Sequence, residues 1–327
     1  MPIRALLYSA DSPDREPGLA SIQVAGLSER ELLWIDLSSP TDEELQAVAD
    51  QIDCDAALLR IGPGKRARPT LSNHGHRFRL TAMAVALPQP DRETVAHWLT
   101  LIAGANYVVS VHEGGVEFVD ELREREKGDT GIGALSSESF VASLLDWLLN
   151  TYFQALEQVV KEIDSIEVSI LGRRAPGSST PLVKVLIQAR RRVAEIRRML
   201  ISHRDVFYGL ARPDFMATEN AQTRPHFMSL NSRLERAEDD VDHTRELVVG
   251  AFELLSMRAA QKTNDVMRAL TYVTVLLGTL ALTAGVLGMN FDMPLFHTGT
   301  RGFLVALSGM LGATLLSLAL AKWRKWI

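Results

Sequence analysis

The stretch that decides the fold is Ala269–Phe291, ALTYVTVLLGTLALTAGVLGMNF, which contains no charged residue. A second uncharged run, GFLVALSGMLGATLLSLALA, occupies Gly302–Ala321. Each run is close to the roughly 20 apolar residues that cross a bilayer as a helix. A long helix in a soluble core normally keeps a polar face, and neither run has one. The sequence therefore predicts two membrane spans, over about 269–290 and 302–321.

The charges around the two runs predict their orientation. Basic residues flank them on the sides away from the connecting loop, and these are Lys262, Arg268, Lys322, Arg324 and Lys325. The loop itself carries only Asp292, Arg301 and His297. The positive-inside rule places the basic flanks, and with them both termini, in the cytoplasm. We therefore expect a multi-pass protein of the cell (inner) membrane, held in the lipid bilayer by a C-terminal helical hairpin.

The composition of the whole chain excludes several classes of protein. Of its 327 residues, 35 are basic and 40 are acidic, so the formal net charge is −5 and a nucleic-acid binder is not expected. The single cysteine, Cys54, cannot form an intrachain disulfide. No phosphate-binding Walker loop and no GxSxG or HExxH motif occurs, so we expect neither ATP-driven transport nor an enzyme.

Short β-like runs alternate with helical ones over residues 1–133 and predict a small cytosolic α/β domain. Strands are expected at Ile3–Ser9, Leu32–Leu37, Arg77–Leu87, Val95–Ile102 and Tyr107–His112. Ser39 or Thr41 is expected to cap the helix that follows the second strand.

Residues 134–268 are expected to be helical and to end in a stalk helix. Two antiparallel helices are predicted over 138–171 and 181–210, and one continuous helix over 226–290. A helix that long needs neighbours along its length, as in a stalk. Residues 269–327 then form the transmembrane hairpin, a short outer loop and a cytosolic tail, so the fold class is an α+β membrane protein.

One face of the first span carries small or weakly polar side chains. At 100° per residue this face lies within roughly 100° of arc. Its members are Asn264, Met267, Thr271, Thr274, Gly278, Ala281, Gly285 and Met289. A contact between two helices is one explanation of such a stripe. A pore lining is favoured because the stripe extends beyond the span, through Met267 and Asn264.

The tripeptide Gly288-Met289-Asn290, followed by Phe291 and Met293-Pro294, resembles the signature of the CorA-type metal-ion transporters. The likeness includes the upstream segments NDVM and LT, the C-terminal AKWRKWI and the order of parts along the whole chain. It implies a homopentameric funnel in which the first span of each subunit lines one central pore. It also implies that Gly288, Met289 and Asn290 form the selectivity filter.

The physics of a hydrated ion agrees with these roles. Mg²⁺ releases its water reluctantly, and a ring of neutral Asn290 amides would accept hydrogen bonds from that water without trapping the ion. Met267 and Leu270, repeated around the axis, would form a hydrophobic gate. The other expected pore-lining residues are Asn264, Thr271, Thr274, Gly278, Ala281 and Gly285. Asp292 and His297 are the expected ion contacts of the outer loop.

Departures from the family pattern leave the choice of ion open. Leu295 and Phe296 stand where many relatives have a glutamate, and Ala281 stands where magnesium-transporting members have a threonine. His297 suits Zn²⁺ better than Mg²⁺. We therefore expect transport of a divalent cation without a catalytic cofactor, with Mg²⁺ slightly ahead of Zn²⁺, and Co²⁺ or Ni²⁺ behind them. The alternatives are a zinc transporter, with or without proton coupling, and a membrane-tethered regulatory or scaffold protein without transport.

A group of acidic residues on the predicted stalk is a candidate cytosolic metal site between subunits. Its members, with one histidine, are Glu238, Asp239, Asp242, His243 and Glu253. Most acidic runs on helices are solvated faces, and that interpretation is favoured here.

Overall fold

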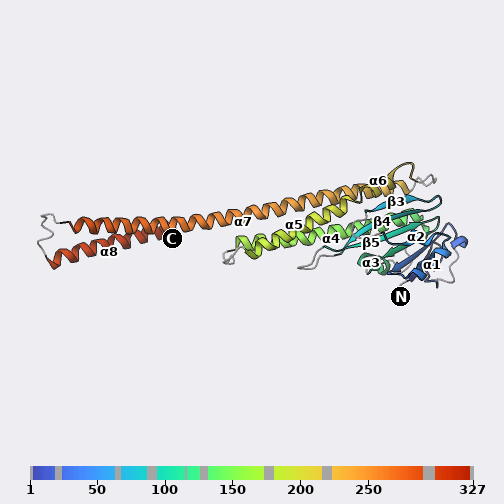
Figure 1. Ribbon diagram of the computed structural model, residues 1–327, viewed down its shortest axis with the longest axis horizontal. Helices are drawn as coiled ribbons and strands as arrows, with labels where there is room; N and C mark the ends of the chain where they lie inside the picture. Colours follow the sequence, from blue (N-terminus) through green and yellow to red (C-terminus); the bar gives the residue numbers. More distant parts are fainter. Residues whose placement is uncertain are drawn as a thin grey trace. The chain divides into compact units, whose positions relative to one another are not determined.

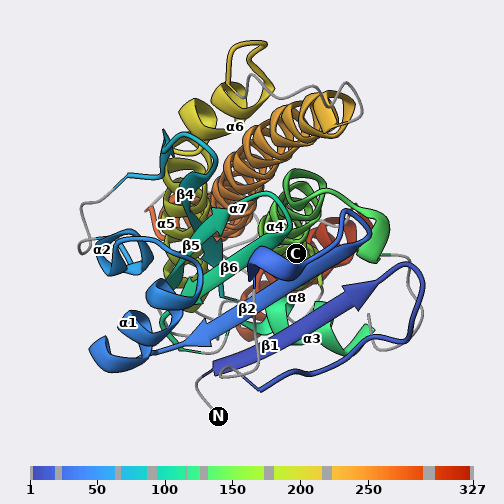
Figure 2. The same cartoon turned by 90° about the vertical axis from the view of Figure 1, so that its right-hand side faces the viewer.

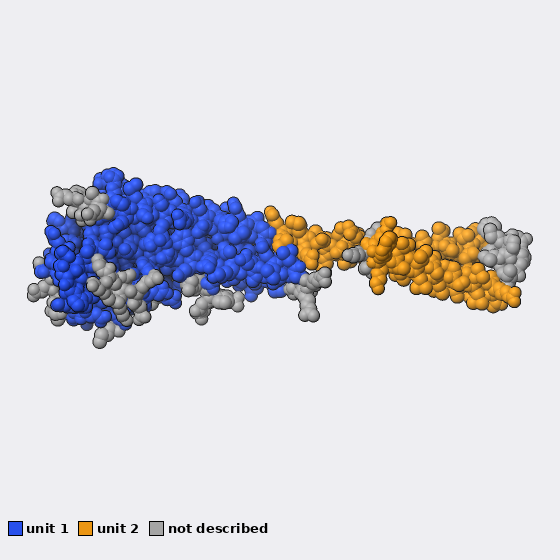
Figure 3. All heavy atoms as spheres, turned by 180° about the vertical axis from the view of Figure 1, so that it is seen from behind, with its two compact units in different colours: residues 1–251 blue, residues 252–327 orange. Residues whose placement is uncertain are grey.

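The computed structural model describes residues 3–18, 24–62, 68–86, 94–114, 116–125, 132–172, 180–215, 223–289 and 299–324. The chain forms two compact units, Met1–Ala251 and Phe252–Ile327, which are coloured separately in Figure 3. One helix, α7, belongs to both units because it runs from Thr223 to Leu287. The domain boundaries expected after residues 133 and 268 stay predictions.

A mixed six-stranded sheet is the framework of the first unit (Figure 2). Its strands are β1 Ile3–Ser9, β2 Glu31–Ser38, β3 Thr70–Asn73, β4 Phe78–Val85, β5 Ala96–Ala103 and β6 Tyr107–His112. Their spatial order is β1-β2-β6-β5-β4-β3. Neighbouring strands are antiparallel except the central pair β2 and β6, which are parallel.

Both faces of the central strands are covered, and this explains why β2 has the nearly apolar sequence ELLWIDLS. On one face Ile35 and Val109 share an apolar core with Val48 of helix α1. On the other face Trp34 meets Phe140 of helix α4 edge to face, with ring centroids 5.3 Å apart. The helices and 3₁₀ turns of this region are η2 Val24–Gly26, α1 Asp42–Gln51, α2 Ala56–Leu59, α3 Glu117–Arg125, η3 Ile132–Ala134 and α4 Ser137–Leu171.

The five predicted strands are confirmed, with bounds that differ by no more than two residues from those expected. The end of the third, Leu87, lies outside the described residues. Thr41 caps α1 through a capping box, in which its hydroxyl oxygen accepts from the Glu44 N–H and the Glu44 carboxylate accepts from the Thr41 N–H. Strand β3 and helices α2 and α3 were not predicted from the sequence.

The predicted helix pair is confirmed for its first member, whereas the second member is broken. Helix α5 spans Thr180–Ile201, and a separate helix, α6, spans Arg204–Ala211. The break falls at His203, whose imidazole Nε2 accepts from the backbone N–H of Met83 in β4. The prediction of one helix over 181–210 was therefore wrong, because a contact with the sheet redirects the chain.

The long helix is confirmed as one continuous element. Helix α7 spans 65 residues, about 97 Å at 1.5 Å per residue. Its N-terminal half packs within the first unit, where Phe227, Leu234 and Val241 are buried. Within the second unit, α8 (Thr300–Trp323) runs beside the C-terminal part of α7 (Figure 1).

Candidate functional site

The candidate site lies on α7 in the second unit. Helices α7 and α8 are each long and apolar enough to cross a membrane, and neither apolar segment is buried within the chain. Leu282 of α7 and Leu315 of α8, for example, are 70% and 67% exposed. Exposed apolar surface of this extent does not fit the core of a soluble domain, so these two helices fit membrane spans.

One face of α7 packs against α8. The Tyr272 and Ser317 hydroxyl oxygens are 2.8 Å apart and join the two helices. The least exposed residues of α7 in this region share that face, and they are Ala269, Tyr272, Leu276, Leu280 and Leu287. The facing side of α8 is built mainly from small residues, with Gly302 and Ala321 buried, which lets the two backbones approach closely.

The predicted pore stripe lies on the opposite side of α7. Gly278 is two residues from both Leu276 and Leu280, so it points about 200° away from them. All of the expected pore-lining residues are exposed in the chain. A Cβ atom at Gly278 or Gly285 would meet no atom within 4 Å. The contact between α7 and α8 therefore does not use this stripe, which is free to face other copies of the chain or water.

The stripe offers oxygen atoms to an aqueous ligand. The Thr274 hydroxyl donates to the Leu270 carbonyl oxygen, 2.9 Å away on the preceding turn. Its proton is therefore held by the helix, and the lone pairs of its oxygen remain to accept from water. Such an oxygen can bind the hydration shell of a cation without carrying a charge.

The expected gate residues are on the exposed side of α7. Met267 is 56% exposed and Leu270 is 59% exposed. Each lies one helical turn before a threonine of the stripe, Thr271 or Thr274. Asn264 lies one further turn along the same helix and is also exposed. Their position fits an apolar collar if several copies of α7 surround an axis.

The expected filter lies where α7 ends. The helix closes at Leu287, the Gly288 N–H donates to the Ala284 carbonyl oxygen over 2.9 Å, and the Met289 N–H donates to that of Val286 over 3.2 Å. Gly288 and Met289 are both exposed. Asn290, Asp292 and His297 lie outside the described residues.

The candidate metal residues of the predicted stalk do not converge. Glu238 pairs with Arg204 of α6, with 2.6 Å between Oε1 and Nε, and Asp242 pairs with Arg197 of α5 at 3.1 Å. Glu253 belongs to the other unit, while Asp239 and His243 are exposed. In the described part of the chain, no group of three or more His, Cys, Asp or Glu side chains is placed to hold a metal ion. A site shared between subunits stays a prediction.

Comparison with known proteins places the chain in a family. The family described as "CorA-like Mg2+ transporter protein" matches residues 29–323. A cobalt/magnesium transport protein CorA of Thermotoga maritima is 28% identical over 236 residues, which cover 72% of this chain and 66% of that protein. A cobalt/magnesium transport protein CorA of Methanocaldococcus jannaschii is 22% identical over 99% of this chain and 100% of its own length.

Solved structures agree on the fold. The complete structure of the CorA magnesium transporter from Methanocaldococcus jannaschii has a TM-score of 0.71 at 19% identity, covering 100% of this chain and 99% of that one. The full-length CmaX protein has a TM-score of 0.66 at 22% identity, covering 99% and 97%. The family match over residues 29–323 and the two apolar helices lead to one assignment. The chain belongs to the CorA-like Mg²⁺ transporters, which are channel-like divalent-cation transporters and not enzymes.

Proposed function

We propose that this protein moves divalent metal cations across the cell membrane through a central pore enclosed by five copies of the chain, with Mg²⁺ favoured over Zn²⁺. The observation that carries the proposal is the exposed stripe of α7, from Asn264 to Gly285, on the side opposite α8. Two helices cannot enclose a conduit, so a pore requires several copies around an axis. Five is the number that the family resemblance implies.

In this arrangement the ion passes in its hydrated form. Thr274 and the other polar members of the stripe accept hydrogen bonds from the hydration shell, so the pore does not have to remove the water of Mg²⁺. The Asn290 ring selects ions by their size and hydration, and the neutral amides let the ion leave. Met267 and Leu270 close the inner end by excluding water.

The proposed orientation puts the first unit and both termini in the cytoplasm. Basic residues on that side of the spans, Lys262, Arg268, Lys322 and Arg324, support it through the positive-inside rule. The loop with Asp292 and His297 then faces outward, where these two side chains meet the arriving ion.

The decisive test is ion flux with both metals on one preparation. The full-length protein in liposomes is expected to pass Mg²⁺ faster than Zn²⁺, each followed with an ion-selective dye inside the vesicles. Asn290→Ala should abolish selective flux and leave the oligomer intact. Leu315→Ala, on the exposed surface of α8, is the matched control and should retain flux.

The other outcomes discriminate between the alternatives. Faster Zn²⁺ than Mg²⁺ flux would assign the protein to zinc transport, for which the nitrogen ligand of His297 is suited. No flux of either ion, from an intact oligomer, would show a scaffold or regulatory protein and overturn the proposal.

A further inference from the structure

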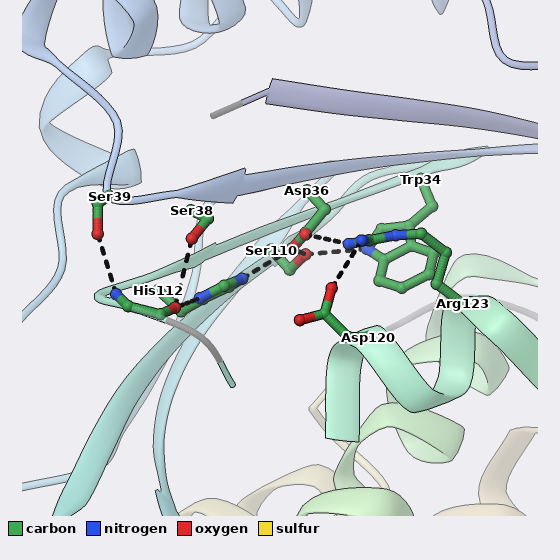
Figure 4. Close-up of polar contacts among 9 residues, drawn as sticks. Trp34, Asp36, Ser38, Ser39, Ser110, His112, Asp120 and Arg123 are labelled. Carbon is green, nitrogen blue, oxygen red and sulfur yellow. Dashed lines mark hydrogen bonds and ion pairs between the residues drawn. The ribbon is translucent and has the colours of Figure 1, made fainter. Parts of the chain in front are cut away.

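A network of buried charged side chains lies between the sheet and helix α3 in the first unit (Figure 4). It joins Asp36 of β2, His112 of β6 and Arg123 of α3, which are 4%, 3% and 7% exposed. Charged groups are rarely buried to this extent without a partner. The function proposed above uses none of these residues.

Asp36 is the centre of the network and accepts from several donors. The Arg123 Nη2 donates to Oδ2 over 2.5 Å, and the Ser110 hydroxyl donates to Oδ1 over 2.6 Å. Ser110 must donate to Asp36, because its oxygen already accepts from the indole N–H of Trp34, which is 2.9 Å away and cannot accept. These contacts suit an ionised carboxylate.

His112 stands between two acceptors. Its Nδ1 is 2.6 Å from the carbonyl oxygen of Gly114, which is a hydrogen bond, and its Nε2 is 3.2 Å from Oδ1 of Asp36, which is an ion-pair contact without hydrogen-bond geometry. A carbonyl oxygen can only accept, so Nδ1 carries a proton, and a carboxylate 3.2 Å from Nε2 attracts that nitrogen only when it is protonated as well. A neutral imidazole carries only one such proton. Only the protonated ring therefore keeps the hydrogen bond to Gly114 and an attractive contact with Asp36 at the same time.

The charges around His112 balance in that state. The groups that face it are Asp36 from β2 and, from α3, Arg123 and Asp120, whose carboxylate is 2.8 Å from the Arg123 Nη1. The titratable side chain of β5 on this side is His97. Its Cε1 lies close to Gly114, 4.0 Å from where a Cβ atom would stand if residue 114 had one. Two carboxylates face one guanidinium, so the imidazolium brings the sum to zero.

His112, together with Ser38 and Ser39, also holds the turn at Gly114 that precedes α3. Gly114 has φ of +72°, which favours glycine, and its N–H donates to the Ser39 hydroxyl oxygen over 2.9 Å. Its carbonyl oxygen accepts from Ser38 at 3.3 Å as well as from His112. Three side chains therefore hold this turn against the sheet, and only one of them titrates near neutral pH.

We infer that His112 is a pH-dependent clamp: when protonated it ties the Gly114 turn and, through Asp36 and Arg123, helix α3 to the sheet, and its deprotonation at higher pH loosens both. Loss of the proton leaves a nitrogen lone pair facing a buried carboxylate, which is repulsive. The ring then relaxes by giving up one of its two contacts. The inference does not rest on transport, because it concerns only contacts within the first unit.

The direction of titration agrees with this geometry. Burial by itself lowers the pKa of His112, but the contact with Asp36 and the bond to the Gly114 carbonyl outweigh it, so that the pKa is raised above its ordinary value of 6.5. A histidine whose pKa is raised on folding stabilises the fold at low pH, and the stabilisation is lost as the pH rises through the folded-state pKa. The clamp therefore holds at slightly acidic pH and opens on the alkaline side.

The first test measures the clamp in the full-length wild-type protein. Backbone amide exchange is followed by mass spectrometry from pH 6 to pH 9 and corrected for the intrinsic dependence of exchange on pH. Protection of the segment from Gly114 to Arg125 should fall about tenfold, the change expected for the loss of one net hydrogen bond. Protection of Phe140–Leu156 in α4 should change less than twofold over the same range. Equal behaviour of the two segments would overturn the inference.

The second test assigns the effect to His112. In His112→Gln the protection of α3 should be low at pH 6 already and should not change further up to pH 9. His97→Gln, a neighbouring histidine without a place in the network, is the matched control and should keep the wild-type dependence. If the glutamine variant does not fold, exchange of the imidazole C2 hydrogen in the wild type gives the titration midpoint directly. A midpoint at or below pH 6.5, or one that Asp36→Asn leaves unchanged, would equally reject the clamp.

Discussion

At the scale of single residues, two buried histidines of the first unit show how the chemistry of the partners sets the sign of a titration. His112 faces two acceptors, and its protonated form is favoured. His203 faces one donor and one acceptor: Nε2 accepts from the Met83 N–H, and Nδ1 is 2.9 Å from the Met199 carbonyl oxygen. That pair of contacts suits the neutral ring, and complete burial lowers the pKa of His203 to about 4.

This contrast predicts a loss of stability in acid. As the pH falls below 6.5, the unfolded chain binds a proton at His203 before the folded chain does, so the free energy of unfolding decreases by about 1.4 kcal/mol per pH unit. The decrease ends near pH 4, after about 3 kcal/mol in all. Thermal unfolding of the first unit, followed by tryptophan fluorescence, should show a midpoint that falls between pH 6.5 and pH 4.5.

His203→Gln separates this contribution from that of the carboxylates. A glutamine oxygen can accept from Met83, and it has no proton to gain. The variant should be less stable at pH 7 by roughly 1–3 kcal/mol, the cost of an imperfect buried hydrogen bond, and its midpoint should depend less on pH. A variant with the wild-type pH dependence would show that His203 is not the source.

At the scale of elements, local signals predicted most of the structure and distant contacts account for what was missed. The strands were predictable because they are continuous apolar runs between turn residues. The capping role of Thr41 was predictable because acidic residues fill the first helical turn after it. The short strand β3 is polar and lies at the edge of the sheet, so it carries no such signal. The break at His203 depends on Met83, 120 residues away in sequence, which no local pattern contains.

The functional features also divide into those that a local pattern predicts and those that depend on distant contacts. The stripe on α7 was predictable from its period, because position on a helix follows from residue number alone. The buried network was not predicted, although one signal was present: Asp36 is the single interior charge of ELLWIDLS. Its partners Ser110 and Arg123 are 74 and 87 residues distant in sequence, and only the fold brings them together.

The exposed stripe predicts which positions of α7 meet water. In a Cys54→Ser background, Gly278→Cys should react with a charged, membrane-impermeant thiol reagent, and the reaction should reduce flux. Leu277→Cys, at the same depth but about 100° around the helix, should react at least about tenfold more slowly, because a thiol in hydrocarbon does not ionise. Faster labelling at Leu277 than at Gly278 would place the pore on another face.

The apolar collar predicts a leak when it is made polar. Met267→Asn should wet the inner end of the pore, raise basal flux and make it less sensitive to metal on the inner side. The alternative role for Met267 is packing between neighbouring copies of α7, and the same substitution would then loosen the oligomer without raising flux. Flux and oligomer mass, measured on the same preparation, distinguish a leaky intact assembly from a dissociated silent one.

At the scale of the whole molecule, one chain leaves its largest apolar surfaces uncovered. Met267, Val275, Leu304 and Leu311, with other apolar residues of α7 and α8, are more than half exposed, and only one face of each helix is used in the pair. A bilayer covers the part that faces outward. The small-residue stripe of α7 offers lipid little apolar side-chain surface, and the threonine oxygens keep lone pairs that can accept from water. Copies of the chain that place their stripes around one axis enclose these groups with water instead.

The proposed pore of five chains predicts the mass of the assembly. The detergent-solubilised protein should measure about five times the mass of one chain by mass photometry, once the detergent and lipid contribution is subtracted. Gly278→Leu should reduce flux and leave the mass of the assembly unchanged, because a Cβ atom at this position meets no atom within 4 Å other than those of its own turn of helix. If the glycines instead bring neighbouring helices into contact, the leucine will dissociate the assembly before flux can be measured. A wild-type monomer or dimer would leave no enclosed path for an ion, and the pore would have to be abandoned whatever the family.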